Sequence, residues 1–485
     1  MRIRHRSVNL FLLISILLIA FSCSLPESNS FQSNDHQSVF NPRDLTIDIP
    51  DDPIITDDSD GTISGTAYYV DSIAGSDGNN GLSQNAPWKS FAPLVGLQLQ
   101  PGDGVFLRRS ASWNETLNLQ GKGTAENPVV LASYGTGNSP VIEMNGKWGD
   151  HCVVLEDPSF WVIRNLSVKK AKQGIYLRYY HDDLALPDDS PYGNRNILIE
   201  SCRFEDMLYE FHPDYSESDE DGNWIKDENG IIQMREYAWS AGIMIGGRIS
   251  SANEGLTVLD GLTVTDCFFN NTQVGICVNL WGSTNKDRFK NFVFRNNLFT
   301  NMLAGMFQVY NCNTGLAEYN RLIGMNGGYV KWGSTGGLLQ ATKNWTVRNN
   351  EFANVTNGGG NDGVGFDFEG DDENCVFSHN IIRGCDSGGL LIMYTMGPIV
   401  NVDVHDNIFY DNLRNTSDHY SLECDISVLD AGVPHGGIAA TGKIFDNDFY
   451  VYDTDRYYTK WALEYGMVNP GQDGNHFDVM SNCPY

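Results

Sequence analysis

The chain has 485 residues, of which 41% are hydrophobic and 19% are charged, so it can bury a sizeable core and is not a fully disordered protein. Its 50 glycines favour many short strands joined by tight turns over long helices. The net charge of −29 excludes binding to nucleic acid through phosphate contacts, which requires a positive surface.

The first 22 residues have the organisation of an export signal. Three arginines precede an apolar run over residues 8–21, which is short for a membrane span but suits the core of a signal peptide. The run ends at Ala20, Ser22 and Cys23, which resemble the lipidation site of bacterial lipoproteins. We therefore expect export and a lipid anchor on Cys23 at the bacterial cell surface or outer membrane. Ordinary cleavage, with secretion or a periplasmic location, is the alternative.

Residues 23–65 are rich in Ser, Asn, Asp and Pro and show no hydrophobic period, which is typical of a disordered tether. A repeated pattern occupies residues 66–455, and residues 456–485 are expected to form a C-terminal cap or tail.

The repeat consists of short strands. Apolar and polar residues alternate with period two over Ile197–Phe204, and this arrangement recurs at 262–269, 292–299, 345–352, 375–382 and 402–409. A turn and a second short strand that begins with glycine follow many copies, as at Gly174, Gly242, Gly275, Gly305, Gly365 and Gly389. Two or three strands per repeat with no helix between repeats predict a parallel β-helix, whose coils stack about 4.8 Å apart.

One column of the repeat is mostly asparagine: Asn297, Asn320, Asn350, Asn380, Asn407 and Asn447. In a stack of coils these amides would form an internal ladder that satisfies buried backbone groups at a corner. Cys202 and Cys267 occupy the same column, which predicts buried thiols there and leaves a disulfide between neighbouring coils open.

With its alternating strands, asparagine column and glycine-led strands, the chain resembles the right-handed parallel β-helix proteins of the pectin-lyase-like superfamily. The opening segments Tyr68–Asp71 and Pro101–Asp103 strengthen this resemblance. It implies an all-β, right-handed, single-stranded parallel β-helix over about residues 66–455. The fold carries lyases, hydrolases, epimerases, adhesins and tailspikes, so it does not define a reaction.

Two acidic insertions, at about 179–194 and 205–240, interrupt the repeat. Loops of this kind often build the binding groove of a solenoid, although solvated acidic loops are an equally good interpretation.

The best catalytic candidates are Asp367 and Glu369. If Phe366 and Phe368 point into the core, both carboxylates project from the outer face, with Cα atoms about 6.6 Å apart. Such a pair suits either retaining or inverting glycoside hydrolysis, because each carboxylate perturbs the pKa of the other and supplies an acid and a base.

The preceding glycine-led strand, taken as residues 328–332, predicts Tyr329 and Lys331 beside this pair. Polar and aromatic side chains farther along the same face are candidate sugar subsites: Trp281, Gln308 and Tyr310.

Two other interpretations of this acidic segment stay open. Asp362, Asp371 and Asp372 could bind a structural Ca²⁺ through carboxylate oxygens, or Lys331 could simply neutralise the acids. His379 and His405 are weaker candidates, because they lie at repeat corners where polar residues are routine.

These observations lead us to expect an exported, monomeric enzyme that cleaves glycosidic bonds in a polysaccharide by hydrolysis. One alternative is a Ca²⁺-dependent lyase of a uronate polymer with Lys331 as the base. The other is a surface protein that binds glycan without catalysis.

Overall fold

The computed structural model describes most of the repeat region. The described residues are 63–146, 149–179, 193–207, 240–246, 256–279, 285–325, 327, 334–358, 362–394, 397–415, 424–430, 440–450, 468–469 and 476–479. Cys23, Trp281, Tyr329 and Lys331 lie outside them, as do the predicted signal peptide and most of both insertions.

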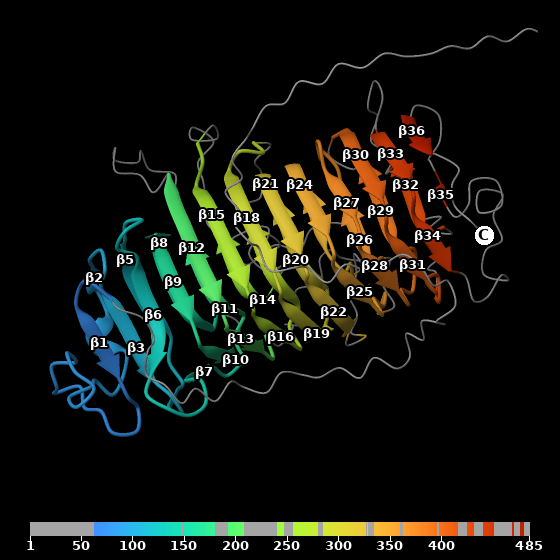
Figure 1. Cartoon of the computed structure of the whole chain (residues 1–485). Coiled ribbons are helices and arrows are strands. Elements are labelled where there is room, and N and C mark those ends of the chain that lie inside the picture. The colour runs from blue at the N-terminus through green and yellow to red at the C-terminus, as the bar shows by residue number, and fades with distance from the viewer. Residues whose placement is uncertain are drawn as a thin grey trace, which may run out of the picture. The chain divides into compact units, whose positions relative to one another are not determined.

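The protein is a right-handed parallel β-helix in which three parallel sheets run along the stack of coils (Figure 1). The first sheet has 13 strands: β1 (Ala67–Val70), β3 (Gly104–Arg108), β6 (Val129–Tyr134), β9 (Trp161–Arg164), β12 (Asn194–Glu200), β15 (Leu259–Thr265), β18 (Phe289–Arg295), β21 (Cys312–Glu318), β24 (Lys343–Arg348), β27 (Val376–Ser378), β30 (Ile399–His405), β33 (Ala440–Phe445) and β36 (His476–Val479).

The second sheet has 11 strands: β4 (Ser112–Trp113), β7 (Val141–Glu143), β10 (Ser167–Lys169), β13 (Arg203–Glu205), β16 (Phe268–Asn270), β19 (Leu298–Met302), β22 (Arg321–Met325), β25 (Glu351–Ala353), β28 (Ile381–Arg383), β31 (Ile408–Tyr410) and β34 (Asp448–Tyr450).

The third sheet has 12 strands: β2 (Gln98–Leu99), β5 (Leu117–Lys122), β8 (His151–Ser159), β11 (Gln173–Arg178), β14 (Ala241–Gly246), β17 (Val274–Asn279), β20 (Gly305–Tyr310), β23 (Leu338–Gln340), β26 (Phe366–Phe368), β29 (Leu390–Tyr394), β32 (Ile426–Asp430) and β35 (Val468–Asn469). Among the described residues the only helix is the short 3₁₀ turn η2 (Ala92–Leu94), so none is long and apolar enough to cross a membrane.

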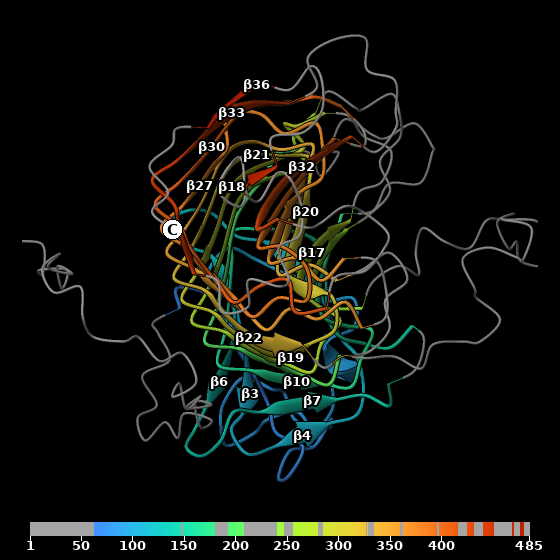
Figure 2. The same ribbon diagram turned by 90° about the vertical axis from the view of Figure 1, so that its right-hand side faces the viewer.

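Between the two ends of the stack each coil contributes one strand to each sheet, and consecutive coils lie over one another (Figure 2). The register is regular: Ile197 pairs with Leu262, which pairs with Phe292. Strands β35 and β36 lie in the segment expected to form a cap or tail, and they pair with β32 and β33.

The core follows from the alternating pattern. Inward side chains of all three sheets form one continuous buried cluster. Phe204, Phe269 and Phe299 stack in this cluster with ring centroids 4.6 and 4.5 Å apart. Gly174, Gly242 and Gly275, near the starts of β11, β14 and β17, lie against this column, and a Cβ on Gly275 would come within 2.3 Å of the Phe299 ring. The recurring glycine is therefore needed for close packing.

The corners explain the other turn-forming residues. The residue that precedes each ladder position has a left-handed backbone, with φ of 55° at Asn296 and Asn349 and 57° at His379. Asparagine and aspartate tolerate this conformation better than most residues, so the repeat selects them there.

The predicted asparagine ladder is confirmed. The side-chain amide of Asn350 donates to Oδ1 of Asn380 (3.1 Å), and that of Asn380 donates to Oδ1 of Asn407 (3.1 Å). The same bonds link Asn297 to Asn320 and Asn407 to Asn447 at 2.9 Å. In the coils before Asn297, Cys202 and Cys267 fill the column as buried free thiols, so they are not joined by a disulfide.

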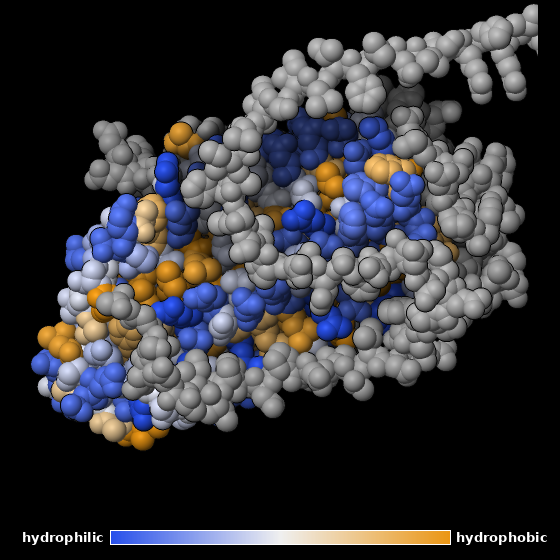
Figure 3. All heavy atoms as spheres, in the orientation of Figure 1, coloured by the Kyte–Doolittle hydropathy of each residue, from blue (hydrophilic) through white to orange (hydrophobic). Residues whose placement is uncertain are grey.

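Hydrophilic and hydrophobic residues are interspersed on the face shown in Figure 3. The exposed large apolar side chains among the described residues are scattered along the sequence and include Ile73, Val95, Leu256 and Val400.

Candidate active site

Asp367 lies at the centre of β26, on the outer face of the third sheet. Its neighbours Phe366 and Phe368 are fully buried in the core, as the alternating pattern predicts. Since successive side chains of a strand point to opposite faces, Asp367 points outward. Its Cα pairs with that of Leu338 on β23 and with that of Leu391 on β29, so an apolar residue flanks it on each side.

The carboxyl group of Asp367 is buried although it is on the outer face. Its side chain is only 2% exposed, and its Oδ1 atom has no hydrogen-bond partner. Burial raises the pKa of Asp367 well above its usual range, and the negative charge of Glu369 raises it further. An ionised carboxylate in this position would be costly, so the environment favours the protonated form.

Glu369 follows two residues later and lies on the same outer face, where it is partly buried. Its backbone N–H donates to the carbonyl oxygen of Leu339 (2.9 Å), and its own carbonyl accepts from the Gln340 amide (3.1 Å). These bonds hold the residue in the extension of β26. Burial raises the pKa of Glu369 to about 7, so both charge states of the carboxyl group are accessible at neutral pH.

Asp362 belongs electrostatically to the same group. It is 8% exposed, and burial, followed by the charge of Glu369, raises its pKa to about 8. Its charge in turn acts on the pKa of Asp367. The structure therefore brings Asp362 towards the two predicted catalytic carboxylates.

Two polar residues of β20 were predicted to share this face, and they do. Gln308 pairs with Leu338, which pairs with Asp367, so the three residues occupy one column of successive strands. Gln308 is 4% exposed, and its Oε1 atom has no hydrogen-bond partner. Burial raises the pKa of Tyr310 well above its usual range, and the charges of Glu369 and Asp367 add to this effect.

The strand that precedes β26 in the third sheet is formed by other residues than the sequence led us to expect. That strand is β23, which follows Gly336 and Gly337, and not residues 328–332. The prediction that residues 328–332 form this strand is therefore wrong, and Tyr329 and Lys331 themselves lie outside the described residues. Leu338 and Gln340 hold those positions, and sequence reasoning missed them because both segments begin with glycine.

A physical difference separates the two glycine-led segments. A Cβ on Gly336 would lie 2.1 Å from the Gly365 carbonyl oxygen and 2.8 Å from the Phe352 ring. Gly336 thus belongs to the column of glycines that packs against the core phenylalanines. The sequence itself contains a signal for it, since Gly336 lies 29 residues before Gly365, close to the 30-residue steps of the adjacent ladder positions.

The three carboxylates expected to share a calcium ion have different partners. Asp371 forms an ion pair with Lys286 (3.0 Å), whereas Oδ1 of the fully buried Asp372 accepts from the backbone N–H (2.9 Å) and hydroxyl (2.7 Å) of Thr342. Asp362 interacts with Glu369 instead. Within the described part of the chain, these three residues do not form a group of converging ligand atoms.

The fold and these side chains define a right-handed parallel β-helix with a buried acidic site on one sheet. No protein-family model matches the chain. Over 141 residues it is 33% identical to a curated lacto-N-biosidase of Bifidobacterium longum subsp. longum, and the match covers 24% of this chain. The chain matches only 9% of the length of that relative.

Solved structures show the same fold. The chain resembles the native GH136 lacto-N-biosidase from Eubacterium ramulus with a TM-score of 0.54 at 18% identity, over 80% of this chain and 68% of that chain. For the selenomethionine derivative the TM-score is 0.59 at 17% identity, over 86% and 67%. At these identities the similarity establishes the architecture and not the reaction.

Proposed function

We propose that this protein is a glycan-processing enzyme that hydrolyses glycosidic bonds with the carboxyl groups of Asp367 and Glu369. The observation that carries the proposal is the buried, outward-pointing carboxyl of Asp367 with an unpartnered oxygen, two residues from Glu369. The partial match to a lacto-N-biosidase supports the same class, because the name of that relative denotes a glycosidase.

The two carboxyl groups have different environments, which suits them to different roles. Asp367 is the more deeply buried and keeps its proton, so it acts as the general acid that protonates the glycosidic oxygen. Glu369 is partly buried and loses its proton near pH 7, so it acts as the base or the nucleophile. The charge of Asp362 acts on the pKa of Asp367. Whether the anomeric configuration is retained or inverted then depends on the distance between the reacting oxygens.

The surrounding side chains favour an uncharged sugar. The side-chain amides of Gln308 and Gln340 can exchange hydrogen bonds with hydroxyl groups. Each charge that acts on the pKa of Asp367 is another carboxylate. A polyanionic substrate would be repelled here and by the net charge of −29, so we favour a neutral glycan over a uronate polymer.

The test is a glycan screen with three protein variants. Reducing ends and unsaturated products are followed for the wild type, and active substrates are then used with Asp367→Asn and Glu369→Gln. Each variant is expected to lose about 10²–10⁴-fold in kcat/KM, the usual contribution of a general acid or base. Glu373→Gln is the matched control, because this nearby carboxylate is 44% exposed and pairs with Lys286.

The outcomes separate the alternatives. Unchanged cleavage by both site variants would contradict the site, and an unsaturated product would indicate the lyase. Binding to a glycan without cleavage of any substrate would indicate a non-catalytic surface protein. Proton NMR of the first product then distinguishes retention from inversion.

Export and lipid attachment at Cys23 belong to the same proposed function, as does a monomeric state. Export and the lipid anchor rest on the apolar run 8–21 and the Cys23 context. Mass spectrometry of the mature N-terminus and fractionation of a Cys23→Ser variant test the anchor. A soluble wild-type protein without lipid would contradict it.

A further inference from the structure

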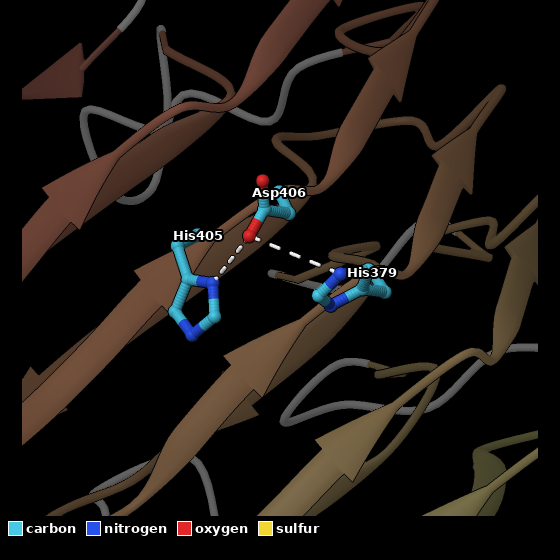
Figure 4. A group of neighbouring side chains, drawn as sticks. All are labelled: His379, His405 and Asp406. Atoms are coloured by element: carbon cyan, nitrogen blue, oxygen red, sulfur yellow. Dashed lines mark hydrogen bonds and ion pairs between the residues drawn. The ribbon is translucent and has the colours of Figure 1, made fainter. Parts of the chain in front are cut away.

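A second cluster of titratable side chains lies at the corner of the coils where the first and second sheets meet, whereas Asp367 lies on the third sheet. It consists of His379, which follows β27, His405 at the end of β30, and Asp406. One ligand atom from each residue lies within 4.8 Å of the other two. Figure 4 shows the Asp406 carboxylate between the two imidazole rings.

The distances show how these side chains converge. The Asp406 Oδ2 atom is 2.7 Å from Nδ1 of His405 and 3.9 Å from Nε2 of His379. The ring centroids of the two histidines are 5.9 Å apart, and the rings are nearly perpendicular. Two imidazole nitrogens and one carboxylate oxygen are thus directed at a common region.

The fold holds this arrangement in place. His379 and Asp406 occupy the same corner position of successive coils, one residue before the ladder partners Asn380 and Asn407. Both have left-handed backbones, with φ of 57° and 55°. The His379 N–H also donates to the His405 carbonyl (3.3 Å). The cluster is therefore fixed by the register of the stack.

The ring of His405 is also restrained from the next coil. It stacks on Phe445 with centroids 4.8 Å apart and an angle of 12° between the planes. Its side chain is 22% exposed, while those of His379 and Asp406 are 56% and 46% exposed. An ion can therefore reach the group from solvent, and a water molecule can complete its coordination.

We propose that His379, His405 and Asp406 form a binding site for a divalent transition-metal ion of the zinc type, which links two successive coils. Two neutral imidazoles with one carboxylate are a donor set that Zn²⁺ favours, whereas Ca²⁺ and Mg²⁺ prefer ligand sets made of oxygen. The site lies apart from Asp367 and does not depend on the proposed hydrolase function. Its role is stabilisation, because an ion that binds only the folded state raises the unfolding temperature.

The structure supplies conservative variants for the test. His379→Asn places at this corner the residue found at Asn349, which has the same left-handed backbone. Asp406→Asn also preserves the corner, and His405→Ser introduces the residue that Ser378 provides in the preceding coil. The matched control is Asp266→Asn, because Asp266 has φ of 55° at the same corner of an earlier coil and precedes Cys267.

Zn²⁺ binding is measured by isothermal titration calorimetry at pH 7.5 on the full chain without a polyhistidine tag, after removal of metal by a chelator. We expect one ion per chain, and a loss of affinity of about tenfold or more in each site variant but not in Asp266→Asn. Zn²⁺ should also raise the Tm of the wild type and of the control, and not that of the site variants.

Absence of Zn²⁺ binding by the wild type would overturn the assignment. Wild-type affinity in His379→Asn or in Asp406→Asn would do the same. The eight cysteines among the described residues are all buried, so they do not offer a competing surface site.

Discussion

The buried carboxyl of Asp372 provides a quantitative test of the electrostatics of this solenoid. The side chain is fully buried; its Oδ1 atom accepts both bonds from Thr342, and its Oδ2 atom has no partner. Burial raises the pKa of Asp372 from its ordinary 3.8 to about 8, against the opposing effects of Thr342 and Lys286. The folded state therefore binds this proton more tightly than the unfolded state does.

The direction of the pH dependence follows. Below about pH 4 both states are protonated and the full stabilisation is present. As pH rises towards 8 the unfolded state ionises first, so stability falls. The difference between the pKa of Asp372 in the folded and in the unfolded state corresponds to a loss of on the order of 5 kcal/mol in the free energy of unfolding. About 4 kcal/mol of this loss occurs between pH 5 and pH 9. Asp372→Asn keeps an acceptor for Thr342 and cannot ionise, so it should lack this contribution.

The assay is urea unfolding followed by circular dichroism from pH 5 to pH 9, with wild type and variant side by side. Asp372→Asn should be the less stable protein at pH 5, because its buried amide has no acceptor, and the more stable one at pH 9. Glu373→Gln, an exposed change in the same turn, should follow the wild type at every pH. A difference between wild type and Asp372→Asn that does not vary with pH would refute the reasoning.

Three further predictions concern the site, the ladder and the glycine column. The value of kcat/KM should rise with pH through an apparent pKa near 7 as Glu369 ionises. A pH profile that is flat from pH 5 to pH 9 would contradict the role of Glu369 as base or nucleophile. Asn350→Ala removes the amide that donates to Ala317, Arg348 and Asn380. It should lower the free energy of unfolding, measured by urea titration, by about 3–5 kcal/mol. A loss below about 1 kcal/mol would contradict the energetic role of the ladder. Gly365→Ala would place a Cβ 2.3 Å from Ile382 Cγ2 and 2.5 Å from the Gly389 carbonyl oxygen. Because β26 must then shift, both the Tm and the activity of the variant should decrease. An unchanged Tm would show that the glycine column has room for a methyl group.

Much of the fold was predictable because each coil repeats the same local constraints. Alternating residues placed Phe366 and Phe368 inside and Asp367 outside, and the asparagine column identified the ladder. These inferences need only the period of the strand and the fact that equivalent residues stack. They do not require knowledge of any loop.

The remaining features depend on the exact register and on the direction of corner side chains. Gly336 leads into the neighbouring strand because it packs against Phe352, and the only trace of this packing in the sequence is the 29-residue step from Gly336 to Gly365. Asp371 and Asp372 are adjacent in sequence, yet a left-handed turn at Asp371 sends them to different partners. The contact of His379 with Asp406 was accessible in principle, since both residues precede a ladder asparagine.

The ladder has a consequence for how this protein can change during evolution. Its bonds keep nearly the same length whether the two asparagines are 23 residues apart, as at Asn297 and Asn320, or 40 apart, as at Asn407 and Asn447. Chain length between corners is therefore independent of the spacing between coils. Segments that leave the stack can be lengthened, shortened or exchanged while Asp367 and Glu369 keep their positions. Selection can then change these segments without rebuilding the scaffold.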